Sequence, residues 1–221
     1  MKNEYSIFLA LMVLSVYAIS CTPAQPATSA PAPEVKPSPQ QQETAQPAAQ
    51  KQEISAEVKE LLDKPKTRVK SIYYHYRGPE TGSNFHEFYV KGDKIKYKPY
   101  LEIKSLDRPD SYDTIFIDKT AGTAQSYCTA AYCAYKGKKS DLSYANFYLP
   151  TVFDWIDGLE YANKIGEEVI DSRSTWKVET KNGILWVDTF YGIPLKVESG
   201  GKTYRYQQIS VNSVQDSDVV P

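Results

Sequence analysis

Polar and apolar residues alternate with two different periods along the chain. Residues 54–62 place Ile54, Val58 and Leu61 at helical spacing, so a short amphipathic helix with Ser55 as its N-cap is expected there. From residue 68 the period is two over most of the chain, which is typical of strands with one buried face. The strands predicted in this way are residues 68–77, 85–91, 94–106, 114–118, 124–129, 165–170, 174–180, 184–189, 195–199 and 203–211.

A second helix is predicted between the two groups of strands. Residues 147–162 carry Val152, Ile156 and Leu159 at helical spacing after Pro150, and Gly158 favours an interruption or an end of this helix. Together with the many strands, the two helices indicate the α+β class.

The turns of the C-terminal half are the clearest local signals. Asn182-Gly183 and Gly200-Gly201 are two-residue hairpin turns, because type I′ turns need positive φ at both central positions. Strands joined in this way pair antiparallel. We therefore expect one large, strongly curved antiparallel sheet of about nine to eleven strands, with helices packed on one face.

The first 52 residues differ in composition from the rest. Residues 7–19 are apolar apart from Ser15 and follow Lys2, which is the arrangement of a secretory signal peptide and is too short for a comfortable membrane span. Seven of the 14 prolines lie between residues 21 and 51, in a tract without apolar periodicity that cannot fold alone. The expected organisation is a signal peptide at 1–20, a disordered tether at 21–52 and one folded domain at 53–221.

The end of the apolar run, Ala18-Ile19-Ser20-Cys21, resembles the lipobox of prokaryotic lipoproteins. The resemblance implies that Cys21 is lipidated, for example with palmitate, and that the protein is exported and anchored to the cell membrane or the outer membrane. Ala18, Ile19 and Glu4 depart from the usual pattern. The alternative is an ordinary cleaved signal peptide followed by a coincidental cysteine.

Charge excludes one class of partner. The chain has 26 basic and 27 acidic side chains, a formal charge of −1, so it lacks the basic field of a typical nucleic-acid binder. No nucleic-acid partner is expected.

Residues 166–221 resemble the LolA-like lipoprotein-carrier superfamily, which also includes LolB, the N-terminal domain of RseB and mycobacterial lipid-binding lipoproteins. The strongest match is Leu185-Trp186-Val187-Asp188, followed after a short turn by Gly192-Ile193-Pro194-Leu195-Lys196. The resemblance implies an open half-barrel whose concave face, covered by helices, binds acyl chains or a lipidated polypeptide. A tethered chain resembles the membrane-attached members rather than the soluble shuttle.

Cys128 and Cys133 are the cysteines that remain after Cys21. In an oxidising, extracytoplasmic compartment their spacing in a predicted hairpin favours a disulfide, which would stabilise the fold by about 2 kcal/mol. A redox dithiol would favour two-residue spacing, and a zinc site would need His75 and His86, which lie on different predicted strands. No metal site and no cofactor are expected.

Aromatic residues are unusually frequent on the predicted strands. Tyrosine favours strands, so ordinary β packing is one explanation. The other is a ligand cavity, in which rings meet apolar chains. The residues expected to line such a cavity are Tyr74, Tyr76, Phe88, Trp155 and Trp186, with Trp155 on the covering helix.

Enzyme signatures are absent from the sequence. It contains neither G-x-S-x-G nor H-E-x-x-H, and Gly201-Lys202-Thr203 lies in a predicted hairpin turn rather than in a phosphate-binding loop. Asp107, Asp110 and Asp113 do not have the spacing of an EF-hand.

The sequence therefore predicts a monomeric, non-enzymatic binding protein for a lipid or for the acyl chains of a lipoprotein, with the helix near residues 150–158 as a lid. The alternatives are an envelope sensor or protein-interaction module whose interior is filled by its own side chains, and a surface glycan binder or hydrolase.

Overall fold

The computed structural model describes residues 53–101 and 107–221. The predicted signal peptide, the tether and Cys21 lie outside these residues. The helices are α1 (Ala56–Arg68) and α2 (Tyr144–Phe147), with short 3-10 turns η1 (Pro79–Thr81) and η3 (Asp216–Asp218). Within the described ranges, no helix is both long enough and apolar enough to cross a membrane.

Eleven strands form one antiparallel sheet, which confirms the large antiparallel sheet expected from the sequence. They are β1 (Ile72–Arg77), β2 (His86–Lys91), β3 (Lys94–Lys98), β4 (Thr114–Asp118), β5 (Thr123–Tyr127), β6 (Lys139–Leu142), β7 (Ala162–Ile170), β8 (Arg173–Thr180), β9 (Gly183–Asp188), β10 (Pro194–Ser199) and β11 (Lys202–Val211).

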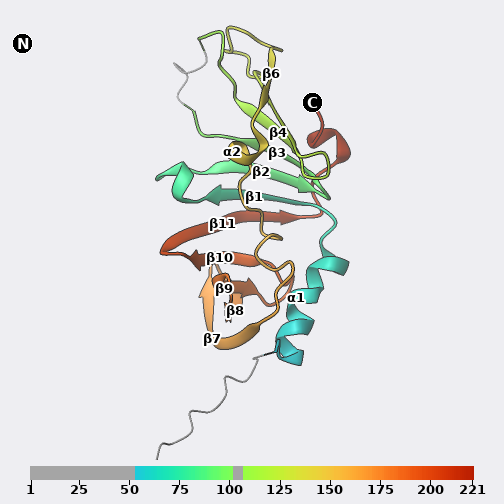
Figure 1. Ribbon diagram of the computed structural model, residues 1–221, viewed down its shortest axis with the longest axis vertical. Coiled ribbons are helices and arrows are strands. Elements are labelled where there is room, and N and C mark those ends of the chain that lie inside the picture. Colours follow the sequence, from blue (N-terminus) through green and yellow to red (C-terminus); the bar gives the residue numbers. More distant parts are fainter. Residues whose placement is uncertain (1–52, 102–106) are drawn as a thin grey trace, which may run out of the picture. The chain divides into compact units, whose positions relative to one another are not determined.

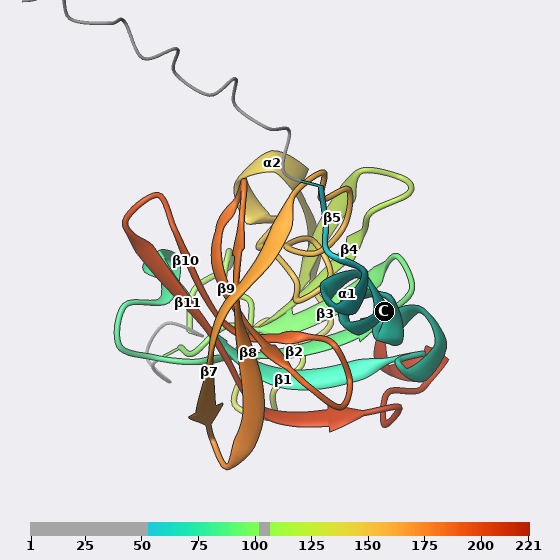
Figure 2. The ribbon, with the colours of Figure 1, turned by 90° about the horizontal axis from the view of Figure 1, so that it is seen from below.

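Strands that are consecutive in the sequence are neighbours in the sheet, with one exception. The spatial order is β6-β5-β4-β3-β2-β1-β11-β10-β9-β8-β7, so β1 pairs with β11 at the centre. Figures 1 and 2 show that the sheet is curved and does not close, since β6 and β7 remain its two edges.

The helix α1 forms where the sequence predicts it, but it continues to Arg68. The side chain of Ser55 caps it by accepting a hydrogen bond from the backbone N–H of Val58. Its buried face consists of Val58, Leu61, Leu62 and Pro65.

Gly192, from the motif that resembles the LolA-like superfamily, makes room for α1. Its φ is +76°, and a Cβ atom there would lie 2.2 Å from the carbonyl oxygen of Leu61 and 2.8 Å from Pro65 Cδ. The turn between β9 and β10 can therefore approach α1 only with glycine at this position. Lys64 Nζ and Arg68 Nη1 also donate hydrogen bonds to carbonyl oxygens of this turn.

One face of the sheet is covered and holds the main core. Tyr74, Tyr76, Phe88 and Tyr206 have no exposed surface and pack in one cluster with Val58 of α1. We call this side the covered face and the opposite side the outer face.

The second predicted helix is not present. Residues 148–161, which we call the crossing segment, form a series of turns that runs over the covered face from α2 to β7 (Figure 1). The expectation of helices covering a concave face is therefore not confirmed for this segment.

Local contacts hold this segment as a turn. Asp154 accepts hydrogen bonds from the backbone N–H and the hydroxyl of Thr151 and one from Lys119, so its carboxylate fixes the turn against the sheet. The β-branched Thr151 and Val152 have low helix propensity, and Gly158 takes φ = +61° where the chain turns.

Other differences concern strand limits. β3 ends at Lys98, whereas a strand was expected to continue to residue 106, and residues 102–106 lie outside the described part. β6 was not predicted, because a four-residue edge strand with the sequence Lys-Ser-Asp-Leu has almost no apolar alternation.

Replacement of Tyr206 by Phe tests how the crossing segment is attached. The Tyr206 hydroxyl accepts a hydrogen bond from Trp155 Nε1 (2.6 Å) and donates one to the carbonyl oxygen of Pro150 (3.0 Å). Tyr206→Phe leaves both groups without this partner and should lower the free energy of unfolding by about 1–3 kcal/mol. Urea denaturation measures this. Tyr127→Phe is the control, since the half-buried Tyr127 hydroxyl donates only to Gln125 at 3.3 Å; an equal loss in both variants would contradict the assignment.

Candidate ligand groove

A cavity of about 460 Å³ lies between α1 and the crossing segment. We call it the α1 groove. Its apolar wall comes from α1 and its flanks, from β2 and from the crossing segment: Ile54, Leu62, Pro65, Val69, Val90, Phe153, Ile156 and Leu159. Because Leu62, Pro65 and Val90 also belong to the buried core, the groove is an open extension of that core.

Charged side chains surround this apolar wall. The lining includes four lysines and three aspartates: Lys59, Lys66, Lys70, Lys119, Asp63, Asp93 and Asp157. Asp63 lies between two of the lysines, at 2.7 Å from Lys59 Nζ and 2.6 Å from Lys66 Nζ. Hydrogen bonds from Lys59 and Lys66 lower the pKa of Asp63 to about 2. The exposed Lys70 forms no side-chain ion pair with any described residue.

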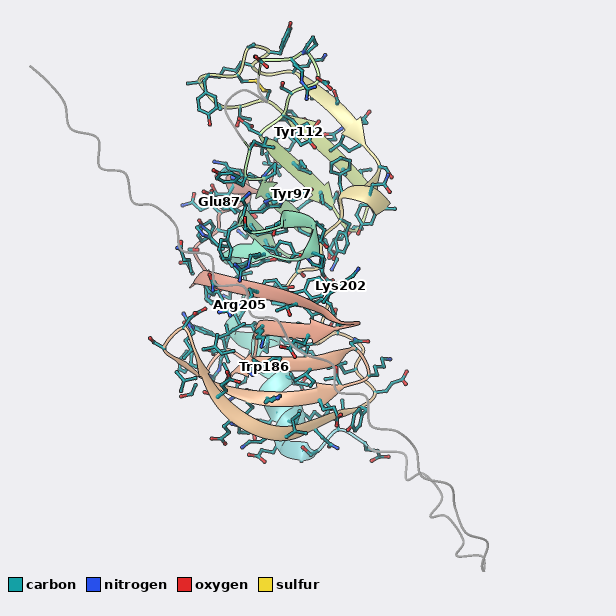
Figure 3. All side chains as sticks on the ribbon, turned by 90° about the vertical axis from the view of Figure 1, so that its left-hand side faces the viewer. Glu87, Tyr97, Tyr112, Trp186, Lys202 and Arg205 are labelled. Atoms are coloured by element: carbon teal, nitrogen blue, oxygen red, sulfur yellow. A yellow bond between two sulfur atoms is a disulfide. The ribbon has the colours of Figure 1, made fainter. Side chains whose placement is uncertain are left out.

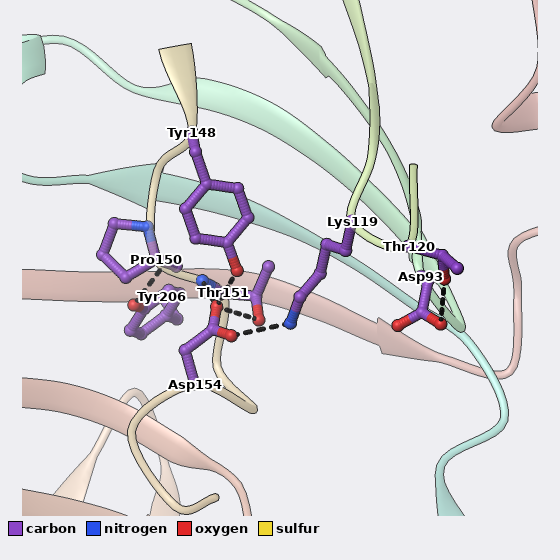
Figure 4. A network of polar contacts seen from close by, with 8 residues as sticks. All are labelled: Asp93, Lys119, Thr120, Tyr148, Pro150, Thr151, Asp154 and Tyr206. Atoms are coloured by element: carbon purple, nitrogen blue, oxygen red, sulfur yellow. Dashed lines mark hydrogen bonds and ion pairs between the residues drawn. The ribbon is translucent and has the colours of Figure 1, made fainter. Parts of the chain in front are cut away.

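The crossing segment is held to the sheet by Asp154 (Figure 4). Oδ2 of Asp154 accepts hydrogen bonds from the Tyr148 hydroxyl (2.6 Å) and from both the backbone N–H (2.6 Å) and the hydroxyl (2.7 Å) of Thr151. Oδ1 accepts a bond from Lys119 Nζ at 2.8 Å. Burial by itself would raise the pKa of Asp154, but these hydrogen bonds outweigh it and hold the pKa below its ordinary value. One carboxylate thus ties the segment to the end of β4.

Four of the five residues predicted to line a ligand cavity lie on the covered side. Tyr74, Tyr76 and Phe88 are fully buried in the core, with the Tyr74 and Phe88 rings stacked at 5.3 Å. The ring of Trp155 packs on Tyr204 at 4.8 Å, and its Nε1 donates to Tyr206. None of these four side chains lines the α1 groove.

Trp186, the fifth residue, lies on the outer face. Its Nε1 donates to Glu168 Oε2 at 2.6 Å, and its ring packs with Ile170 and Leu195. Neighbouring residues Leu185 and Val187 point to the covered face instead. The register of β9 therefore separates Trp186 from the α1 groove.

The aromatic core includes one unsatisfied polar group. The Tyr74 hydroxyl is buried and has no hydrogen-bond partner. Burial also raises the pKa of Tyr74 well above its ordinary value, so the hydroxyl is neutral. The centre of the covered face is thus filled by the protein's own rings, and the available space lies beside α1.

The sequence analysis did not identify the residues of the α1 groove, because they come from segments far apart in the chain. One signal for its support is present. The spacing Thr151-x-x-Asp154 is a capping-box pattern, and one of its two bonds, from the Thr151 backbone N–H to the Asp154 carboxylate, forms without a following helix; the Thr151 hydroxyl donates to the same carboxylate.

The cysteines and histidines have structural contacts. Cys128 and Cys133 form a disulfide in the hairpin between β5 and β6, with Cα atoms 6.1 Å apart. His75 Nε2 shares a hydrogen bond with the Tyr73 hydroxyl (2.8 Å), and His86 Nδ1 accepts one from the Tyr100 backbone (3.1 Å). Across residues 53–101 and 107–221, no three His, Cys, Asp or Glu side chains gather as a metal site.

The chain is similar to several solved structures, each at 14% sequence identity or less. The lipoprotein LppX of Mycobacterium tuberculosis aligns with 72% of this chain and 96% of its own, at 14% identity and a TM-score of 0.42. LprF of Mycobacterium bovis aligns with 76% of this chain and 98% of its own, at 12% identity and a TM-score of 0.42. MucB, solved in complex with MucA(peri), aligns with 73% of this chain and 58% of its own, at 14% identity and a TM-score of 0.35.

No protein-family model and no curated protein matches the sequence.

Replacement of Asp154 by Asn tests its role through pH. The pKa of Asp154 is lower in the folded protein than its ordinary value of 3.8, so the ionised carboxylate stabilises the fold above that value. This contribution is lost as the pH falls through 3.8 towards the lower folded-state pKa. Asp154→Asn should therefore be less stable than the wild type at pH 7, by about 2–3 kcal/mol, as expected for hydrogen bonds to a charged group.

The difference in unfolding free energy between Asp154→Asn and the wild type should shrink as the pH falls from about 5 to about 2, because only the wild type loses an ionised carboxylate at this position. Chemical denaturation at each pH measures it. The exposed Asp157, for which no side-chain hydrogen bond is found, provides the control variant Asp157→Asn, which should follow the wild type. A difference that does not change with pH would refute the electrostatic role of Asp154.

Proposed function

We propose that this protein is a lipid-anchored, extracytoplasmic binding protein that holds a hydrophobic ligand, such as the acyl chain of a lipid or lipoprotein, in the α1 groove. The observation that carries this proposal is the groove itself. Its volume of about 460 Å³ lies within the usual range of ligand pockets, about 300–1,000 Å³, and its eight apolar lining residues are typical of such pockets.

Burial of methylene groups supplies the binding energy. Each one removed from water contributes about 0.8 kcal/mol, so eight of them contribute about 6 kcal/mol. This corresponds to dissociation constants between about 1 mM and 1 μM. Such an affinity suits a protein that receives and passes on its ligand rather than one that stores it.

The charged rim suits an amphiphile. Lys59 and Lys66 already share Asp63, whereas Lys70 is exposed at the same opening without such a partner. An anionic headgroup would contact Lys70 while the acyl chain lies against Leu62, Val90 and Ile156. Binding in this way requires no catalytic step.

The crossing segment is the proposed lid. It supplies Phe153, Ile156 and Leu159 to the groove and is attached through Asp154 and Trp155. Because Val152 is fully buried in the core, the outward movement would involve residues 153–159 and break the side-chain bonds of Asp154 and Trp155.

A second candidate function is supported by the filled interior. Tyr74, Tyr76, Phe88 and Tyr206 fill the centre of the covered face, which is the arrangement expected of a protein-interaction or sensor module of this fold. In that case the α1 groove would contact an apolar side chain of a partner protein.

A tryptophan introduced into the α1 groove distinguishes the two candidate functions. Ile156→Trp fills the space with a larger side chain and should weaken the binding of a fluorescent fatty acid about tenfold or more, a loss of about 1.4 kcal/mol. Fluorescence titration of residues 53–221 measures this. Val169→Trp is the matched control, because Val169 is 69% exposed on β7 and does not line the groove.

Equal affinity of Ile156→Trp and the wild type would contradict binding in the groove. Failure of the wild type to take up fatty acid, together with a protein mass free of bound lipid in native mass spectrometry, would favour the protein-interaction function. Circular dichroism melting of each variant confirms that it is folded.

Replacement of Cys21 by Ala tests the anchor separately. The lipobox-like sequence proposes Cys21 as the acylated residue, so Cys21→Ala should move the protein from the membrane fraction to the soluble fraction and abolish labelling with an alkyne-tagged palmitate. Ser20→Ala, which keeps the cysteine, should remain labelled. Labelling of Cys21→Ala would show that the anchor is elsewhere.

A further inference from the structure

A row of cationic side chains crosses the outer face of the sheet. On β8 and β9, Lys177 lies opposite Trp186, and on β9 and β10, Trp186 lies opposite Lys196. On β10 and β11, Lys196 lies opposite Arg205, and on β11 and β1, Arg205 lies opposite Arg77. Directly paired residues share a face of the sheet. We call Lys177, Lys196, Arg205 and Arg77 the cation row. Figure 3 labels Arg205 of this row and Trp186, which lies between Lys177 and Lys196. At about 4.8 Å between strands, it spans about 19 Å.

Trp186 holds one end of this row in place. Lys196 Nζ lies 3.9 Å and Lys177 Nζ 5.1 Å from the centre of its ring, and only 3% of Trp186 is exposed. Two ammonium groups on one ring are stabilised by cation–π attraction but repel each other. Trp186 therefore acts as a platform that positions two positive charges.

The cation row is only partly neutralised by its neighbours. Lys196 pairs with Glu198 at 2.7 Å, and Arg205 Nη2 lies 3.5 Å from Asp171. Lys177 and Arg77 form no ion pair within the described part of the chain, and the guanidinium of Arg77 lies over the Phe85 ring at 5.0 Å. Arg205 lies directly opposite both Lys196 and Arg77, and the like-charge repulsion is offset only in part by Glu198, Asp171 and Glu168 on the same face.

Arg205 carries a second sign of an incomplete site. Its Nε is buried and has no hydrogen-bond partner among residues 53–101 and 107–221. A buried donor without an acceptor is costly, by about 1–3 kcal/mol. Nε itself is covered, so an oxyanion on this face would contact the exposed part of the Arg205 guanidinium, whose side chain is 26% exposed, and add negative charge there.

A polar cavity of about 390 Å³ adjoins Arg205 through Asp171. Its lining includes Arg173 and the two glutamines Gln207 and Gln208. No hydrogen bond of either glutamine side chain is found among the described residues, so both amides are available to hydroxyl groups. Leu195 and Ile209 provide an apolar floor of the kind on which a sugar ring can lie.

We propose that the outer face binds an acidic polysaccharide, with its carboxylate or phosphate groups on the cation row and its sugar hydroxyls at Gln207 and Gln208. The row runs across interior strands whose backbone groups are already paired, so an extended peptide cannot add there as a strand. Side chains alone make the contacts, and cations, amides and a small apolar floor match charged sugars.

The test uses residues 53–221 and two charged probes, oligogalacturonate and phosphorylated dextran, with neutral dextran of similar length as the reference. Isothermal titration should show binding of at least one charged probe and weaker or no binding of neutral dextran. Because exposed charges are screened by salt, the affinity should fall as NaCl is raised from 50 to about 500 mM.

The double variant Lys196→Gln and Arg205→Gln should weaken binding of the charged probe about tenfold. The matched control is Lys136→Gln with Lys202→Gln, two exposed lysines outside the row, which removes the same charge and should bind like the wild type. Gln207→Ala should weaken binding of the charged saccharide while leaving binding of poly-glutamate unchanged. Binding of fatty acid in the α1 groove should be the same in all of these variants.

The proposal is overturned if neither charged probe binds, if neutral dextran binds equally well, or if the double variant and its control lose affinity equally. Tighter binding of poly-glutamate or of phosphatidylglycerol vesicles, in competition with the charged saccharide, would assign the face to a peptide or a membrane instead. If the double variant does not fold in a melting experiment, Lys177→Gln alone serves the same comparison.

Discussion

The carboxylate of Asp154 is the contact on which the covered side of the sheet depends. It accepts bonds from Thr151 and Tyr148 within the crossing segment and from Lys119 at the end of β4. Without a helix, the backbone groups of this segment have few regular partners, so its position depends on side chains. That position in turn sets one wall of the α1 groove.

The sheet provides two faces with different chemistry. Rings and aliphatic side chains fill the covered face, and the space that remains for an apolar ligand lies at its margin, where α1 approaches the turn at Gly192. The outer face carries cations on an aromatic platform. One strand, β11, serves both sides, because Tyr206 points to the covered face and the adjacent Arg205 to the outer face.

Much of the sheet was predictable from the sequence, whereas the site was not. Strands bounded by Asn182-Gly183 and Gly200-Gly201 formed as expected, because turn chemistry and alternation are local signals. The prediction of a helix at residues 147–162 was wrong, because the apolar spacing of Val152, Ile156 and Leu159 is also compatible with turns that pack on a sheet. The orientation of Trp186 depends on the register of β9, which the sequence does not determine. The α1 groove forms where Pro65, Val90 and Phe153, which are distant in the sequence, approach one another in space.

The pairing of β1 with β11 has a consequence for the order in which the molecule is made. These two strands are separated by most of the domain, yet they join the six strands of the first half to the five of the second. A chain that emerges from a translocon or a ribosome with its N-terminus first presents β1 with one edge unpaired until the final strand arrives. The central seam of the sheet therefore cannot close before β11 has emerged, and a chain truncated before residue 202 would lack the strand that unites its halves.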